Sequence, residues 1–210
     1  TTLQGRWLIG ADGASSVVRK HLGLGFEGET YPTASVAIGT PFAFEKHIPD
    51  LCGVNYFWAD GWSFSMFQTK DMWRVGYSPP PDMNAVAAVA DDEIQMRLAR
   101  ILPSTGPFEI ITARLYSVHR RLVEKMRVGR MLLAGDAAHL FSPTGGFGMN
   151  TGVSDAVDLA WKLRAVIEGW GGPNLLASYD TERRPIGSRN TQLAKELYER
   201  LASVMELGDI

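Results

Sequence analysis

The sequence is poor in cysteine, in long apolar stretches and in excess charge. Among its 210 residues is one cysteine, Cys52, which excludes an intrachain disulfide framework; we interpret the thiol as packed or incidental. A membrane span needs about 18 or more consecutive apolar residues, and no stretch approaches that length. The formal net charge is -2 and the basic residues are scattered, so we expect neither nucleic acid nor an acidic membrane as a partner.

Several motifs of catalytic chemistry are also missing. No set of His, Cys and carboxylate residues has metal-ligand spacing, and no serine lies in a G-x-S-x-G elbow, so neither a metal site nor a hydrolase is predicted. The formal G-x-G-x-x-G match at 23–28 follows a predicted helix instead of a strand, and we do not expect it to bind phosphate. The first residues lack a signal-peptide profile, but a chain that begins at Thr1 supports no targeting assignment. The single cysteine fits a reducing cytosol, and we expect a cytoplasmic protein.

The patterns that are present predict a mixed α/β chain. From residue 33 to residue 77, β-branched and aromatic runs are separated by Gly, Asp and Lys, which predicts an antiparallel sheet. The other expected elements are a strand at 6–10, a brief helix at 17–23, a helix at 91–102, a strand at 107–119, a buried strand at 129–135, a helix at 149–168, and a helix after Pro173 that bends near Pro185.

The segment with the clearest chemical meaning joins the last predicted strand to the helix at 149–168. The strand ends in Gly135-Asp136, a glycine cluster follows, and six apolar residues then recur at helical spacing: Val153, Ala156, Val157, Ala160, Leu163 and Ile167. The aspartate can accept hydrogen bonds from sugar-type hydroxyls, and glycines let backbone approach a ligand closely. The free N–H groups of a helix start stabilise negative charge, so the segment suits a polyhydroxylated or anionic ligand.

Three segments resemble signatures of one protein family and lie in that family's order. Residues 129–163, GRMLLAGDAAHLFSPTGGFGMNTGVSDAVDLAWKL, resemble the second FAD-binding motif of the flavoprotein aromatic hydroxylases, the p-hydroxybenzoate hydroxylase-like group A monooxygenases. Residues 8–31, LIGADGASSVVRKHLGLGFEGETY, resemble the family's Asp-Gly motif. Residues 175–185, LLASYDTERRP, resemble the segment that follows the flavin-contacting helix. Together the matches frame nearly the whole chain.

The resemblance implies an α/β (α+β) fold that combines part of a Rossmann-like FAD-binding domain with a mixed or antiparallel sheet substrate domain. Residues 1–30 and 119–170 would belong to the FAD-binding domain, residues 31–118 to the substrate domain, and residues 171–210 to a C-terminal helical segment. The family's opening dinucleotide motif, a βαβ unit of about 30 residues, has no match here. We therefore expect an N-terminally truncated chain with weakened FAD binding.

The resemblance also implies a set of cofactor contacts. Asp136 would hydrogen-bond the ribityl chain of FAD, and Pro143 would flank both the flavin and the substrate. Asp12 would contribute to flavin and pyridine-nucleotide binding by ordering its turn. The remaining implied residues form the helix start along the pyrimidine edge of the flavin ring: Gly146, Phe147, Gly148, Met149 and Asn150.

The implied reaction is the hydroxylation of an aromatic, phenolic or polyketide-like small molecule, in which NAD(P)H reduces FAD and O₂ forms a flavin C4a-hydroperoxide. No catalytic acid or base is assigned, because the flavin carries the chemistry. One face of the middle sheet would line the substrate pocket, although strand aromatics are mostly core residues. The substrate candidates are Tyr56, Trp58, Phe64, Met66 and Trp73, an apolar set without Arg or Lys.

Two alternatives stay open: an FAD-dependent epoxidase or reductase of the same fold, and a non-catalytic fragment. The sequence does not indicate the oligomeric state, the substrate, or a preference between NADH and NADPH. Three basic residues receive structural interpretations. Arg19 could meet a phosphate but is expected mainly at the surface, His139 is expected to pack behind the loop, and His119 to form a hydrogen bond at a domain junction.

Overall fold

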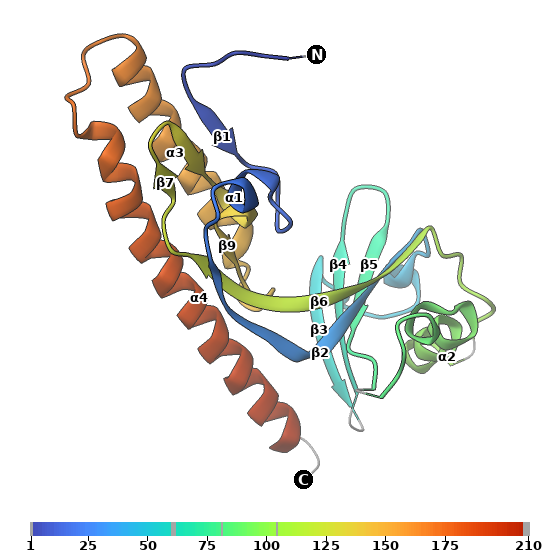
Figure 1. Cartoon of the computed structure of the whole chain (residues 1–210). Coiled ribbons are helices and arrows are strands. Elements are labelled where there is room, and N and C mark those ends of the chain that lie inside the picture. Colours follow the sequence, from blue (N-terminus) through green and yellow to red (C-terminus); the bar gives the residue numbers. More distant parts are fainter. Residues whose placement is uncertain (1, 60–61, 81, 104, 208–210) are drawn as a thin grey trace. The chain divides into compact units, whose positions relative to one another are not determined.

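The computed structural model describes residues 2–59, 62–80, 82–103 and 105–207. Its chain divides into two compact units (Figure 1). Unit 1 comprises Thr1–Thr30 and His119–Leu201, and unit 2 comprises Tyr31–Val118 with the residues from Ala202 on. The chain combines helices with mainly antiparallel strands, which confirms the predicted α/β (α+β) fold class.

Unit 1 contains a small three-stranded sheet in the order β1-β8-β7. The strands are β1 (Leu8–Gly10), β8 (Met131–Leu133) and β7 (Arg127–Val128); β1 is parallel to β8, and β7 is antiparallel to it. A short helix, α1 (Val17–His21), follows β1. The two-residue strand β9 (His139–Leu140) pairs with Arg121 and Leu122 at the end of β6 (Thr112–Val123).

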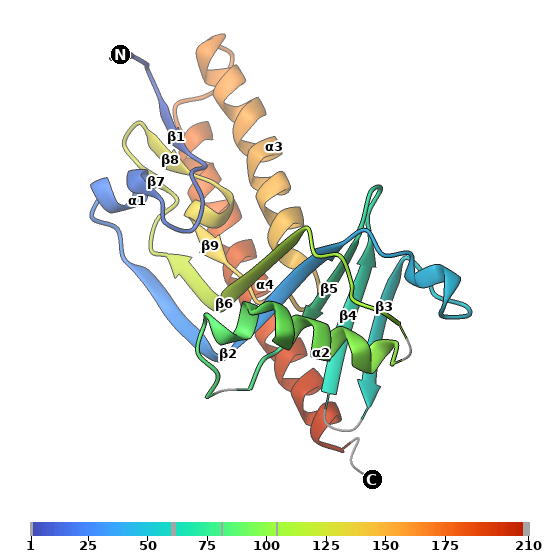
Figure 2. The same ribbon diagram turned by 90° about the vertical axis from the view of Figure 1, so that its right-hand side faces the viewer.

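Two long helices, α3 (Phe147–Ile167) and α4 (Leu175–Leu207), lie side by side (Figures 1 and 2), and α4 belongs to unit 1 as far as Leu201. Pro185 lies inside α4, and the helix continues on both sides of it. The apolar core of the unit gathers side chains from β8, α3, α4 and the turn after β8. Its largest members include Met126, Leu132, Leu133, Leu159, Leu163 and Tyr179.

Helix α3 buries a different face from the one that its apolar spacing suggests. An amphipathic helix ordinarily turns its apolar stripe to the core. Here Leu163 is the one buried member of the predicted stripe, and the other five are exposed: Val153, Ala156, Val157, Ala160 and Ile167. The buried face carries Thr151, Asp155, Leu159, Lys162, Leu163 and Ala165. Polar side chains therefore face the interior because partners are present there.

Unit 2 is an antiparallel sheet with strand order β3-β4-β5-β2, and β6 lies beyond β2. The strands are β2 (Phe26–Thr40), β3 (Val54–Ala59), β4 (Trp62–Gln68) and β5 (Trp73–Tyr77). Helix α2 (Asp91–Ile101) covers one face of the sheet (Figure 2). Two short 3-10 helices, η1 (Phe44–Lys46) and η2 (Ala87–Val89), contribute Phe44 and Ala88, respectively, to the apolar core of this unit.

Candidate functional site

The turn after β8 is built around Gly135 and Asp136. Gly135 has φ 59°, a left-handed conformation that favours glycine, and opens the 3-10 helix η3 (Gly135–Ala137). The turn also lies against α3: a Cβ added to Gly152 would lie 3.3 Å from the Cα of Gly135. Glycine at both positions therefore lets the turn approach the helix backbone.

The carboxylate of Asp136 points out of this turn into solvent. The residue is exposed, and among the described residues none donates a hydrogen bond to its side chain. It is the second residue of η3, and the two residues that follow it, Ala137 and the C-cap Ala138, are fully buried. An exposed carboxylate that has no partner among the described residues is available to accept hydrogen bonds from a ligand.

The start of α3 offers backbone donors next in sequence. Gly146 caps the helix in the left-handed conformation, with φ 66°, and a Cβ added there would meet no atom within 4 Å. Among the residues that the structure describes, no side chain caps the helix, and its first turn holds no acidic residue, so the first N–H groups are available to an anion. Four residues of the predicted contact set are exposed here: Pro143, Gly146, Met149 and Asn150.

The loop before α3 is held by its own packing. Gly145 has φ 82°, and a Cβ there would lie 2.5 Å from the Phe147 ring, so only glycine fits. Within α3, Thr151 Oγ1 donates to the carbonyl of Phe147 at 2.8 Å and accepts from Asn190 Nδ2 of α4 at 3.0 Å. The helix start is thereby tied to α4.

A buried polar network connects the turn, α3 and α4. The carboxylate of Asp155, in α3, is fully buried and accepts three hydrogen bonds from outside its helix. The Gly135 N–H donates to Oδ2 at 3.1 Å, His139 Nε2 lies 2.6 Å from the same oxygen, and Arg183 Nε donates to Oδ1 at 2.9 Å. Burial raises the pKa of the Asp155 carboxyl, but these hydrogen bonds outweigh it and leave that pKa lowered.

The proton positions in this network follow from the partners. A carboxylate only accepts, so Nε2 of His139 carries a proton toward Asp155. The other ring nitrogen, Nδ1, is buried and has no hydrogen-bond partner in the described part of the chain. His139 thus packs behind the loop, as the sequence predicts.

The Asp-Gly segment forms a helix cap beside β1. Asp12 Oδ2 accepts from the N–H groups of Val17 and Val18, at 2.7 and 3.3 Å, and a hydrogen bond with the Ser16 side chain is the main cause of its lowered pKa. Asp12 therefore orders its turn, the local role that the sequence predicts for it. Its contribution to cofactor binding stays a prediction.

The interpretation of Arg19 as mainly a surface residue was wrong. Its guanidinium is buried, donates to the carbonyls of Ala137 and Ala14 at 2.9 and 2.7 Å, and stacks over the Phe26 ring at 3.8 Å. Burial is possible because two carbonyls and an aromatic face replace the water around the charge. Arg19 thus ties α1 to the far end of the Gly135 turn.

The five aromatic and apolar substrate candidates of unit 2 lie on two different faces of its sheet. Phe64 pairs with Tyr77 and Met66 with Val75, so these side chains share the face that α2 covers. Trp73 belongs to the same core and is 3% exposed. Tyr56 and Trp58 lie opposite Ser65 and Ser63 on the other face, and are 54% and 49% exposed. Only this last pair offers accessible surface.

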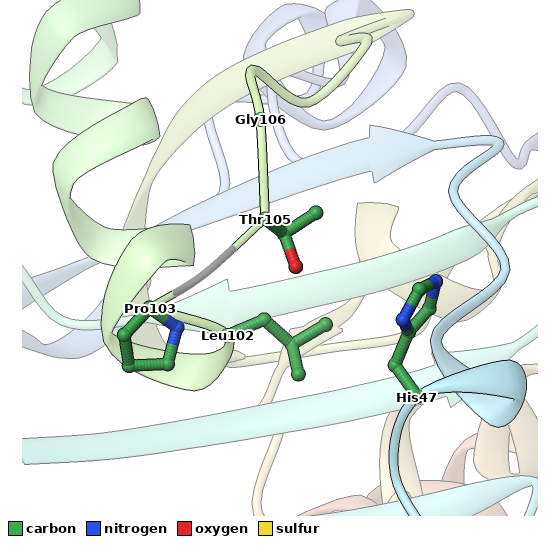
Figure 3. A pocket seen from close by; sticks show the side chains of 5 residues that line it. All are labelled: His47, Leu102, Pro103, Thr105 and Gly106. Atoms are coloured by element: carbon green, nitrogen blue, oxygen red, sulfur yellow. The ribbon is translucent and has the colours of Figure 1, made fainter.

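A pocket of about 480 Å³ lies elsewhere in unit 2, near the end of α2 (Figure 3). It is lined by His47, Leu102, Pro103, Thr105 and Gly106, none of which is a predicted site residue.

In the described ranges no group of three or more His, Cys, Asp or Glu side chains could hold a metal ion. None of the described helices combines the length and the apolar character needed to cross a bilayer.

Comparison with known proteins gives the site a context. Residues 1–194 match the family described as FAD binding domain. The chain belongs to this FAD-binding family. The predicted resemblance to the p-hydroxybenzoate hydroxylase-like flavoproteins is thereby confirmed, and the fold agrees with solved structures of FAD-dependent monooxygenases.

Three relatives illustrate the similarity. The chain is 37% identical over 207 residues to a flavin-dependent monooxygenase of Mycobacteroides abscessus, covering 94% of this chain and 42% of that protein. It is similar to aklavinone-11 hydroxylase, solved in a ternary complex with FAD and aklavinone, with TM-score 0.84, 30% identity, and coverage of 92% and 37%. It is also similar to p-nitrophenol 4-monooxygenase PnpA from Pseudomonas putida DLL-E4, with TM-score 0.81, 29% identity, and coverage of 97% and 54%. The chain spans roughly a third to a half of the length of these relatives.

Two residues of this FAD-binding chain that border the candidate site were not singled out from the sequence. Asp155 and Arg183 lie within the motifs at 129–163 and 175–185, but nothing in either motif reveals that they pair with each other. A charged residue inside a helix is most often solvated. The available signal was that Asp155 interrupts the apolar spacing between Val153 and Val157.

Proposed function

We propose that the chain works in an FAD-dependent monooxygenase that hydroxylates an aromatic small molecule with NAD(P)H and O₂. One observation carries the proposal. In a chain of the FAD-binding family, the exposed carboxylate of Asp136 has no hydrogen-bond partner among the described residues, and an uncapped helix start follows it in sequence. The relatives named as monooxygenases and hydroxylases support the reaction class.

The residues of unit 1 fit the chemistry of a flavin. Asp136 would accept hydrogen bonds from ribityl hydroxyls, and the N–H groups at the start of α3 would stabilise negative charge on the reduced ring. Gly146 leaves open space beside its backbone, which a flat ring can approach. When bound, FAD would accept a hydride from NAD(P)H and activate O₂, so that one oxygen atom enters the substrate and the other leaves as water.

The protein's own contribution would be positioning and exclusion of water. In unit 2, Tyr56 and Trp58 stack at 5.9 Å between ring centroids and present accessible aromatic surface. We propose these two as direct contacts for an aromatic substrate. Phe64, Met66 and Trp73 would act from the core, by shaping the strands that carry the first pair. Pro143, exposed before α3 in unit 1, is the remaining substrate candidate.

The test is an FAD titration of the chain, followed by flavin absorbance and fluorescence. Asp136→Ala should weaken FAD binding by about ten- to hundredfold, the effect of losing a hydrogen bond to a charged group. Glu124→Ala removes another exposed carboxylate of unit 1 and should leave the affinity unchanged. An Asp136→Ala affinity equal to that of the unsubstituted chain would contradict the assigned role, and a full-length protein that binds no flavin would contradict the proposal itself.

Product analysis separates the hydroxylase from its alternatives. With full-length protein, phenols should stimulate NAD(P)H oxidation and be recovered with one added oxygen atom. Epoxidised or reduced isoprenoids as the only products would instead favour the epoxidase or reductase of the same fold. Flavin binding without any turnover by the full-length protein would favour the non-catalytic alternative.

A further inference from the structure

Two aspartates at the candidate site have opposite surroundings. Asp136 is exposed and free of described partners, whereas Asp155 is fully buried and holds three donors from three other elements: η3, β9 and α4. One of those donors is the backbone N–H of Gly135, the residue directly before Asp136. The buried carboxylate therefore holds the peptide group that determines where the exposed carboxylate points.

We infer that Asp155 is a positioning residue for the flavin site: it clamps the Gly135–Asp136 turn and so orients the Asp136 carboxylate. This inference rests on the proposed function for its consequence, since the ligand that Asp136 meets is taken to be FAD. Asp155 itself contacts no ligand in this scheme. It acts through the Gly135 N–H, with His139 and Arg183 holding the carboxylate in place.

The geometry explains why a carboxylate is needed. Oδ2 faces two donors at once, the Gly135 N–H at 3.1 Å and His139 Nε2 at 2.6 Å, so this atom must accept from both. Oδ1 accepts from Arg183, whose Nη2 also donates to the Thr151 carbonyl at 3.4 Å. The Arg183 charge balances the Asp155 charge in a site from which water is excluded, which makes the burial of the carboxylate tolerable.

Gly135, in its left-handed conformation, is the residue whose backbone conformation the hydrogen bond to Asp155 would fix. Glycine has the largest choice of backbone conformations, so a turn built on it is ordered only where other contacts select one of them. The Asp155 hydrogen bond and the close approach of Gly152 provide that selection. Without the hydrogen bond, the Asp136 carboxylate would sample several directions, and each flavin-binding event would have to order it.

The experiment compares Asp155→Asn with Lys162→Met. Asparagine keeps the size of Asp155, but in either orientation its NH₂ group faces a donor: Arg183 Nε in one, and the Gly135 N–H with His139 Nε2 in the other. Lys162 is a matched control, because it is also buried between α3 and α4, pairing with Asp158 and Glu182 at 2.8 Å each, without contact to the turn. Both substitutions remove a buried charge from α3, and Asp155→Asn alone alters the acceptor of the Gly135 N–H.

Two readouts are measured on each protein. The first is amide hydrogen exchange at Gly135, followed by NMR on glycine-labelled chain and normalised to global stability. It should accelerate about tenfold or more in Asp155→Asn, and stay unchanged in Lys162→Met. The second is the FAD dissociation constant by titration, which should rise about tenfold or more in Asp155→Asn and stay unchanged in the control.

The outcomes separate this inference from the proposed function. Unchanged Gly135 exchange in Asp155→Asn overturns the clamp, whether or not the chain binds flavin. Faster exchange with unchanged FAD affinity overturns the positioning role and leaves the proposed function intact. Faster exchange in Asp155→Asn, when the unsubstituted full-length protein binds no FAD, supports the clamp while the proposed function fails.

A milder variant serves if Asp155→Asn does not fold. Arg183→Lys keeps the positive charge beside Asp155 but cannot reproduce the planar contact with both Asp155 and Thr151. Gly135 exchange should then rise about two- to fivefold, with a parallel loss of FAD affinity. Unchanged exchange in this variant would overturn the clamp.

Discussion

Unit 2 fills its interior mainly with apolar side chains from a sheet and one covering helix, and its buried Arg97 stacks on Trp62 and Tyr77. Unit 1 instead buries a carboxylate, an imidazole and an ammonium group between α3, α4 and a turn. In unit 2 the core residues Phe44, Met66 and Val75 are fully buried and make apolar contacts. In unit 1, Asp155 and His139 are fully buried and Lys162 is 1% exposed. Each of these three has a charged or hydrogen-bonding partner within 2.9 Å.

The two kinds of burial differ in whether they fix the orientation of the buried groups. Apolar burial is non-directional, so a core such as that of unit 2 supports a sheet without fixing the orientation of any one peptide group. A buried hydrogen-bond network is directional, and a missing partner is costly, so it selects one arrangement of the groups that it joins. The network of unit 1 ends at Gly135, next to the carboxylate proposed to meet the ligand. Two substitutions in unit 2, a pH series and one pair of substitutions in α3 test this contrast.

The largest effect is expected in the apolar core of unit 2. Trp73→Ala removes a side chain that is 3% exposed and should lower the free energy of unfolding by about 3–5 kcal/mol. Trp58→Ala, on the open face of the same sheet, should cost less than about 1 kcal/mol. Urea denaturation followed by circular dichroism measures both. Equal losses would contradict the assignment of Trp73 to the core and of Trp58 to an accessible face.

A smaller, pH-dependent effect is expected in unit 1. The lowered folded-state pKa of Asp155 means that its ionised form contributes stability above the unfolded pKa, about 3.9, and that this contribution is lost as the pH falls through the folded value. The groups facing the carboxyl are the His139 ring, the Arg183 guanidinium and the Gly135 N–H. A protonated Asp155 resembles asparagine, so Asp155→Asn should be less stable than the unsubstituted chain by about 1–3 kcal/mol near pH 5.

That stability gap should close as the pH is lowered below 4, as measured by urea midpoints from about pH 5 to about pH 2.5. Leu98→Ala supplies the control from unit 2, because Leu98 is fully buried and apolar and its deficit should not change with pH. A constant gap for Asp155→Asn over the same range would show that the ionised carboxylate adds nothing to stability.

Local patterns predicted most of the elements because their signals are local. The aromatic runs at Val54–Ala59, Trp62–Gln68 and Trp73–Tyr77 form strands, and the acidic start at Asp91 opens α2. Turn residues and β-branched side chains determine such elements over a few positions. The strand at 107–119 was displaced, since β6 runs over Thr112–Val123. The family resemblance came from the order of the motifs, which can also be read directly from the sequence.

What the sequence did not reveal depends on partners far away in the chain. The buried Arg19 donates a hydrogen bond to the carbonyl of Ala137, and the buried Asp155 accepts one from Arg183, which lies 28 positions further on. Neither pairing has a local signature. The two faces of the unit 2 sheet could be separated by alternation, but only the structure shows that Tyr56 and Trp58 lie on the open one. Roles of single residues toward FAD and substrate therefore stay predictions.

The smallest effect is expected on the exposed apolar stripe of α3, and it tests the orientation of that helix. Val157 is 64% exposed, so Val157→Ser should change the free energy of unfolding by less than about 0.5 kcal/mol. Leu159, two positions on, is 3% exposed, and Leu159→Ala should cost about 2–5 kcal/mol. If the apolar stripe faced the core instead, Val157→Ser would bury an unpaired hydroxyl and cost more than about 1 kcal/mol. A small loss at Val157 with a large one at Leu159 would therefore place Asp155 and Lys162 on the packed face, where the network of unit 1 requires them.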